Sequence, residues 1–289
     1  MTHSTSLRRL AFIGTGRLGQ TLALAFAEAG EAVVAVASRG ESAAGLAARL
    51  PGCQVMAAAD AVQAAELVFL TVPDDAIAAL AQALPWRAGQ AVVHCSGATE
   101  VTALAAAAQA GAWVGGFHPL QIFSDPARAA GLLAGSAVAI EAAEPLQTRL
   151  QELARLLAMK PLQLPPGARA AYHGAASFAG SYLLSMLDEA VQVWAAVGLP
   201  AEQALQALLP LAQGTLQAAG SRGLAGALAG PISRGDVGVV AAHLQAFDSL
   251  GGAHGEFYRQ LGLRQLGLAR LSGRVDEAVL QRCEVLLRT

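Results

Sequence analysis

The clearest chemical signal in the chain is a glycine-rich stretch near its start, Gly14-Thr15-Gly16-Arg17-Leu18-Gly19. It follows a short apolar run, Leu10–Ile13, and opens a segment with helical spacing, Leu18–Ala29. In such a strand–turn–helix unit the first glycine permits the tight turn, the second lets a pyrophosphate approach the backbone, and the third lets helix and strand pack closely. The helix N-terminus adds unpaired N–H groups and a positive dipole end. All six residues are therefore predicted to bind a dinucleotide; the alternative is a glycine-rich turn without a ligand.

The residues after the second apolar run, Ala32–Ala37, indicate which dinucleotide would bind. Sites that prefer NAD usually place Asp or Glu there for the ribose 2′-hydroxyl, but this chain has Ser38-Arg39-Gly40 and no acid before Glu41. A hydroxyl and a guanidinium suit a 2′-phosphate, and a charge-assisted hydrogen bond contributes about 1.5 to 3 kcal/mol. We therefore predict NADP as the cofactor, unless Arg39 is only a solvated loop arginine.

Two further polar segments, Thr71–Asp75 and His94–Gly97, each follow a later apolar run. Ligands bind in parallel sheets at the carboxyl ends of the strands. The nicotinamide half of the cleft is thus predicted to contact Val72, Pro73 and Ser96. Within the first segment, Asp74 or Asp75 is favoured as a helix N-cap.

A histidine in the segment Gly116–Gln121 is the first catalytic candidate. Hydride reduction of a carbonyl or imine needs a proton donor, or a preorganised dipole, near the atom that gains negative charge. Histidine titrates close to neutrality and can serve either role, so we predict that His118 is catalytic; alternatively it only orients a loop. His94 is a weaker candidate, expected at a strand end against backbone or cofactor.

Three polar residues, His173, Ser177 and Ser181, stand at i, i+4 and i+8 of a predicted helix and would share one face. Facing the cleft, His173 or Ser177 would polarise the substrate with His118, and Ser181 would bind it. Otherwise the three would hydrogen-bond to neighbouring helices, because a buried polar stripe must find partners. Later in the chain, Arg234 is suited to clamp a substrate carboxylate or phosphate, and Asp236 fits a helix N-cap.

Other chemistries are disfavoured by the residue pattern. Lys160 is the only lysine and lies in a predicted linker, which argues against lysine catalysis. The segment after His94 lacks the glycines of a hydrolase nucleophile elbow, and Cys95 cannot pair with His94 because adjacent strand residues point to opposite faces. The six histidines have no metal-ligand spacing, so no metal site is expected.

The elements that must position these residues form two domains. Up to about residue 165, short apolar runs alternate with helical segments, which is typical of βαβ units and a Rossmann-type, doubly wound parallel sheet. Further strands are predicted near Gln54–Met56, Trp113–Phe117 and Ser136–Glu141. After the proline-rich stretch Lys160–Gly167, no strand pattern follows. The predicted helices are Ala168–Val197, Ala201–Ala219, Asp236–Leu250, His254–Leu271 and Val275–Arg288. We therefore predict an α/β domain at 1–165 and an all-α substrate and dimerisation domain at 166–289.

Composition narrows the class of protein. The chain has 289 residues, 54% hydrophobic and 14% charged, which excludes intrinsic disorder. A net charge of −2 gives no reason to expect nucleic acid or an anionic membrane as partner. Two uncharged stretches, Val101–Ser124 and Ala170–Leu187, contain too many polar or small residues to span a bilayer and are expected to be buried in protein.

The compartment is expected to be the cytoplasm. Three widely spaced cysteines do not indicate a disulfide framework. Arg8-Arg9 superficially suggests a twin-arginine export signal, but Gly14, Gly16 and Arg17 leave the following hydrophobic segment too short.

The motifs together also resemble a known family, the Rossmann-like proteins with a C-terminal domain of unknown function numbered 2520. These are related to NADP- and F420-linked oxidoreductases, and more distantly to pyrroline-5-carboxylate reductase, ketopantoate reductase and 6-phosphogluconate dehydrogenase. The matching segments are Gly14–Gly19, Ser38-Arg39, His94–Gly97, Phe117–Gln121, Tyr172-His173 and Gly230–Asp236.

The resemblance implies an NADP-binding Rossmann domain joined to a helical domain that often forms a homodimer interface, but it supplies no substrate. Ser181, after Gly180, replaces an Asn common in such proteins and reaches less far. We predict an NADP-dependent oxidoreductase that transfers hydride between the nicotinamide and a small carbonyl or imine substrate, or a deazaflavin such as F420. The alternative is a dinucleotide-binding sensor or scaffold without turnover.

Overall fold

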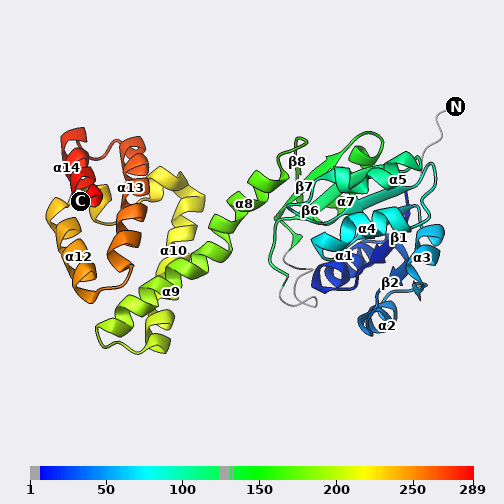
Figure 1. Ribbon diagram of the computed structural model, residues 1–289, viewed down its shortest axis with the longest axis horizontal. Coiled ribbons are helices and arrows are strands. Elements are labelled where there is room, and N and C mark those ends of the chain that lie inside the picture. The colour runs from blue at the N-terminus through cyan, green and yellow to red at the C-terminus, as the bar shows by residue number, and fades with distance from the viewer. Residues whose placement is uncertain (1–6, 124–130, 132) are drawn as a thin grey trace. The chain divides into compact units, whose positions relative to one another are not determined.

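The computed structural model describes residues 7–123, 131 and 133–289, in two compact units, Met1–Ser177 and Phe178–Thr289 (Figure 1). The first unit contains a sheet in the order β3-β2-β1-β4-β5-β6-β7-β8. Its described strands are β1 Arg9–Ile13, β2 Ala32–Ala37, β3 Gln54–Val55, β4 Leu67–Leu70, β5 Ala91–His94, β6 Trp113–Pro119, β7 Ala137–Ala142 and β8 Lys160–Gln163.

The strands pair in parallel except at one position, where β6 and β7 run antiparallel. The predicted doubly wound parallel sheet is thus confirmed, with the difference that one pair near its edge is antiparallel. The strand order reverses between β1 and β4, so the two helix layers separate there and leave a crevice outside the strands' carboxyl ends.

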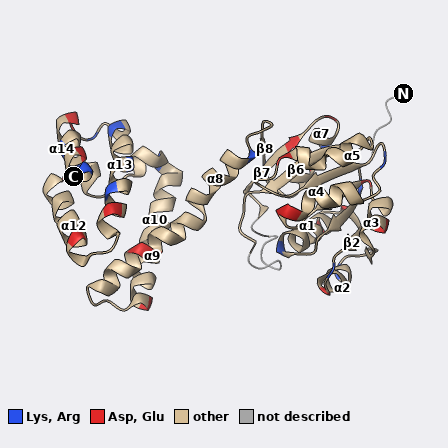
Figure 2. Cartoon of the chain, viewed as in Figure 1, with Lys and Arg blue, Asp and Glu red and all other residues tan. Residues whose placement is uncertain are grey.

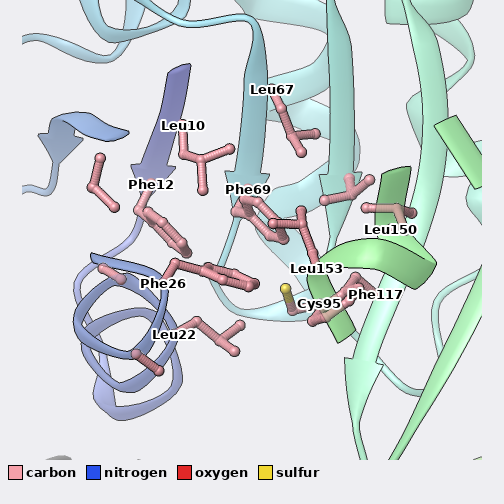
Figure 3. Packing of buried hydrophobic residues seen from close by; sticks show 14 of the residues in the cluster. Leu10, Phe12, Leu22, Phe26, Leu67, Phe69, Cys95, Phe117, Leu150 and Leu153 are labelled. Carbon is pink, nitrogen blue, oxygen red and sulfur yellow. The ribbon is translucent and has the colours of Figure 1, made fainter. Parts of the chain in front are cut away.

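Helices cover both faces of this sheet. They are α1 Arg17–Glu28, α2 Ser42–Ala47, α3 Ala58–Ala64, α4 Asp74–Ala83, the 3₁₀ helix η1 Val101–Leu104, α5 Ala105–Gln109 and α7 Leu146–Leu156. Helix α8, Arg169–Ala179, follows β8. One core lies between the sheet and α1 and α7, where Phe12 stacks on Phe69 with ring centroids 4.9 Å apart (Figure 3). The other core lies against α3, α4 and α5. Because both faces are covered, the strands are apolar at nearly every position.

The proline-rich stretch after α7 is a strand rather than the predicted linker. Lys160–Gln163 forms β8 and pairs in parallel with β7 at the sheet edge. Pro161 cannot donate a ladder hydrogen bond, and an edge strand tolerates this because one of its sides has no partner strand.

The second unit is all helical, as predicted. Its described helices are α9 Ser181–Ala196, α10 Ala201–Ala227, α11 Pro231–Arg234, α12 Val237–Leu250, α13 His254–Ser272 and α14 Glu277–Arg288. Helices α12, α13 and α14 share a core that contains Val240, Leu244, Leu266, Leu280 and Leu287. Both charge signs occur on α13 and α14 (Figure 2), where Arg270 pairs with Glu277 and Glu284. In the described part of the chain, no helix combines the length and apolarity needed to cross a bilayer.

Two details of this helical region differ from the sequence predictions. The helix predicted over Ala168–Val197 is two helices, because Gly180 has φ −105° and ψ −99°, outside the helical region. Asp236 occupies the N-cap position of α12 as predicted, but its carboxylate accepts a hydrogen bond from Arg234 Nε at 2.9 Å instead of capping the helix.

Candidate functional site

The loop between β1 and α1 has the geometry that a dinucleotide phosphate loop needs. Gly14 has φ +102°, and a Cβ there would lie 2.5 Å from the carbonyl oxygen of Thr71. A Cβ on Gly19 would lie 2.6 Å from Thr71 Oγ1, which itself donates to Gly14 O at 2.6 Å. Gly16, by contrast, is the N-cap of α1 and has no described atom within 4 Å of its Cβ position. Two glycines therefore permit close packing, and the third leaves the helix N-terminus open to a ligand.

A cavity of about 760 Å³ opens over this loop, at the carboxyl ends of β1, β2 and β4. Among the predicted cofactor residues, its lining includes Gly14, Thr15, Gly16, Ser38, Arg39, Val72 and Pro73. One wall is apolar and comes from α4, with Ala76 and Leu80, and from Met56 in the segment between β3 and α3. Three other predicted cofactor residues do not line it: Arg17 is exposed at the start of α1, Leu18 packs against the core and Gly19 serves helix packing.

The loop after β5 closes on α4 through Ser96. The Ser96 hydroxyl donates to Asp74 Oδ2 at 2.7 Å and accepts from the Thr99 and Ala98 amides at 2.9 and 3.2 Å. Ser96 is buried and does not line the cavity, so its side chain shapes the loop. The N-cap of α4 is Pro73, which corrects the N-cap prediction: Asp74 and Asp75 lie within its first turn.

Two histidines and a tyrosine from β6 and α8 form a ring cluster beside this loop. His118 Nδ1 lies 3.1 Å from the Tyr172 hydroxyl, and the His118 and His173 rings are 5.8 Å apart at 74°. Gly97 lies against both imidazoles, since a Cβ there would lie 2.5 Å from His173 Cδ2 and 2.8 Å from His118 Nε2. The structure thus brings the predicted residues His118 and His173 together.

The other predicted polar residues are not brought to this cluster within the first unit. Ser177 Oγ donates to the carbonyl of His173 on its own helix at 3.5 Å. Ser181 is an exposed residue at the start of α9, and the break at Gly180 interrupts the predicted i, i+4, i+8 stripe. Arg234 lies in the second unit, 60% exposed and paired with Asp236.

The surroundings of His118 and Tyr172 favour the uncharged form of both side chains. Burial, then the neighbouring His173 and Arg169, lower the pKa of His118 to about 4, with Asp74 acting in the opposite direction. Burial raises the pKa of the Tyr172 hydroxyl. At neutral pH His118 is therefore an uncharged imidazole and Tyr172 a protonated phenol, so either can take part in a hydrogen bond to a substrate atom.

Sequence reasoning missed Tyr172 and Gly97 as members of this cluster. Tyr172 precedes His173 in a helix, and nothing local indicates that it meets a strand residue 54 positions away. His94, the weaker candidate, is fully buried and no described residue hydrogen-bonds to its ring. Burial, then Arg169, lowers the His94 pKa to about 4. The described residues contain no group of three or more His, Cys, Asp or Glu arranged to hold a metal ion.

Family models and solved structures identify the two parts of the chain. A model of a Rossmann-like domain matches residues 4–119, and the model "Domain of unknown function (DUF2520)" matches residues 136–265. The chain therefore carries a Rossmann-like domain followed by a DUF2520 domain, as the sequence motifs suggested. A comparison with curated proteins gives no match.

Several solved structures share the fold. The protein TM1727 from Thermotoga maritima is 21% identical with a TM-score of 0.75, over 92% of this chain and 100% of that one. An imine reductase from Pseudomonas sp. is 18% identical with a TM-score of 0.65, over 96% and 99%. A reductive aminase from Aspergillus terreus, in complex with NADPH, is 18% identical with a TM-score of 0.60, over 97% and 92%.

Proposed function

We propose that this protein is an NADP-dependent oxidoreductase that transfers hydride between the nicotinamide and a small carbonyl or imine compound. The observation that carries the proposal is the open Gly16 end of α1 beneath a cavity of about 760 Å³ that reaches Ser38 and Arg39. The fold shared with an imine reductase and with an NADPH-bound reductive aminase supports the same cofactor and substrate class.

The chain's own residues account for binding of this cofactor. Backbone amides at Gly14 to Gly19 and the α1 dipole would hold the pyrophosphate. Ser38 and Arg39 would hold the 2′-phosphate, because the guanidinium at this point of the cavity has no competing acid on β2. The apolar wall with Met56 and Leu80 suits the flat adenine ring.

The ring cluster would provide the hydrogen bonds and the proton that reduction of the substrate needs. When bound at this loop, NADPH would supply a hydride to the substrate carbon, and the oxygen or nitrogen would then need a proton. The rings of the cluster, His118, His173 and Tyr172, would polarise that atom by hydrogen bonding, and the Tyr172 hydroxyl would give it a proton and regain one from water. Ser177, whose hydroxyl bonds to its own helix, would support His173.

The helical region would complete the substrate site and form a homodimer. We infer that residues 166–289 act as the substrate and dimerisation domain, with Ser181 and Arg234 as its substrate contacts. The dimer is supported by α9, which buries none of its residues within the described chain and exposes Tyr182 and Leu184 at 51% and 67%. Light scattering should therefore report two copies per particle, and Leu184→Glu should lower the mass to that of one copy; a monomeric parent protein would refute the dimer.

The experiment that tests the activity is NADPH oxidation by the purified protein, followed by nicotinamide absorbance against a panel of ketones, aldehydes, cyclic imines and a deazaflavin. We expect turnover with at least one carbonyl or imine and its loss in His118→Ala. The matched control is His243→Ala, because His243 forms the same kind of pair with Tyr258, at 3.0 Å, in the second unit. Tight NADPH binding without turnover across the panel would contradict the proposal and favour a sensor.

A further inference from the structure

A buried arginine, Arg169, lies at the first position of α8. Arg169 is 0% exposed and has the largest fully buried side chain in the described part of the protein. Beneath it, His94 of β5, Gly116 of β6 and Glu141 of β7 pair side by side across the sheet. The guanidinium lies on Gly116, since a Cβ there would be 2.6 Å from Arg169 Cζ. Any larger residue at position 116 would displace the arginine.

The hydrogen bonds of Arg169 connect two separate segments to α8. Its Nε donates to Glu141 Oε2 at 2.7 Å and its Nη1 donates to the Ser96 carbonyl at 2.9 Å. The Arg169 and Gly167 amides donate to the Glu100 carboxylate at 3.2 and 3.1 Å. The start of α8 is therefore fixed to β7 and to the loop after β5.

The attachment of Arg169 also fixes Tyr172 and His173, because all three residues belong to α8. Residues i, i+3 and i+4 share one face of a helix, so Arg169, Tyr172 and His173 face the same way. On the sheet side, His118 lies two residues after Gly116 on β6. The same contact that seats Arg169 on Gly116 thus sets the register in which Tyr172 and His173 meet His118.

Stability alone does not explain a buried arginine here. Replacing a buried ion pair by apolar residues of similar volume is often neutral or stabilising. The positive charge also acts on the site. It lowers the pKa of His94 after burial, and that of His118 after burial and His173. The other groups that face His118 are Tyr172 and His173 from α8, Asp74 from α4 and His94 from β5.

We propose that Arg169 is the positioning residue of the ring cluster: it seats α8 on Gly116 so that Tyr172 and His173 meet His118, and it places a fixed positive charge beside the imidazoles. Its effect on turnover rests on the function proposed above, whereas its effect on the imidazoles does not. His118 then takes part in hydrogen bonding as a neutral imidazole, and Arg169 itself never needs to touch the substrate.

Two variants separate the charge from the geometry. Arg169→Met alone would leave Glu141 as a buried unpaired charge and could unfold the protein, so it is made together with Glu141→Met. Arg169→Lys keeps the charge but loses the planar fork that spans Glu141 and the Ser96 carbonyl. The matched control is the double variant Arg149→Met with Glu31→Met, because Arg149 also pairs with a glutamate and donates to a backbone carbonyl, that of Leu7, on the α7 side of the sheet.

The readouts are the NMR titration of His118, the NADPH dissociation constant and kcat. In the Arg169/Glu141 variant we expect the His118 midpoint to rise, kcat to fall about 100-fold and NADPH affinity to stay unchanged. Arg169→Lys should keep the parent midpoint but lose kcat, and the Arg149/Glu31 control should keep both.

A folded Arg169/Glu141 variant with the parent's His118 midpoint and kcat would overturn the proposal. If the parent protein shows no turnover with any compound, the proposed function fails, and a shifted His118 midpoint in the same variant would still support the role of Arg169.

Discussion

Gly97→Ala adds one methyl group at the centre of the ring cluster. The added Cβ would lie 2.5 Å from His173 Cδ2 and 2.8 Å from His118 Nε2, whereas ordinary van der Waals contact begins near 3.4 Å. The two rings must therefore retreat by roughly 0.6 to 0.9 Å. Gly97 does not have a left-handed backbone, so alanine adds contact without backbone strain.

The expected magnitude follows from this displacement. Overpacking a fitted site costs about 1 to 3 kcal/mol of folding stability, and misplacing catalytic groups by about 1 Å costs on the order of 100-fold in rate. The assays are urea unfolding, NADPH binding and kcat/KM with the substrate found in the NADPH-oxidation panel. We expect lower stability and kcat/KM with unchanged NADPH affinity, because the phosphate loop lies on β1 and α1.

Gly45→Ala provides the control for the same chemical change. Gly45 is exposed in α2 with no described atom within 4 Å of its Cβ position, so alanine should leave kcat/KM unchanged and stabilise the helix by up to about 1 kcal/mol. If Gly97→Ala retained the parent's kcat/KM and stability, the packing of His118 and His173 on Gly97 would be refuted.

Three further predictions concern the cofactor loop and pH. Arg39→Asp should reverse the preference from NADPH to NADH in binding titrations. An unchanged ratio of the two dissociation constants would exclude Arg39 as the residue that binds the 2′-phosphate. Gly14→Ala should abolish the thermal shift caused by NADPH, because it combines strain at φ +102° with a clash against Thr71 O, about 2 kcal/mol or more; a normal shift would contradict the loop geometry. The pKa values of His94 and His118 fall from 6.5 to about 4 in the folded protein, so the unfolded chain binds protons first as pH drops. Stability should be full above pH 6.5 and decline toward pH 4, by at most about 1.4 kcal/mol per pH unit for each histidine. Urea unfolding should show a shallower decline in His94→Leu, and an equal slope would exclude a buried neutral His94.

The sequence predicted those parts of the molecule that depend on local pattern. The glycine-rich turn between β1 and α1 was predicted because its three glycines stand at fixed spacing between a strand and a helix, a pattern set within a few residues. The strands of the sheet interior were found because burial on both faces makes them continuous apolar runs. The α-helical second unit was found from helical periodicity.

The parts that were missed depend on tertiary contacts or on exceptions to local rules. The strand β8 was missed because it contains Pro161. A proline fits there because β8 is an edge strand. The break at Gly180 divided a pattern that is helical on both sides, so Ser177 and Ser181 do not form one stripe. The burial of Arg169 was not predicted. Gly116 and Glu141, which accommodate its guanidinium, come from strands far earlier in the chain.

The central claim is that the first unit binds NADPH through the loop between β1 and α1. Isothermal calorimetry with the intact protein measures this directly. We expect saturable heat with NADPH, a weaker response with NADH, and no heat from either in Gly14→Ala. Absence of heat with every pyridine nucleotide, oxidised and reduced, at millimolar concentration would contradict it.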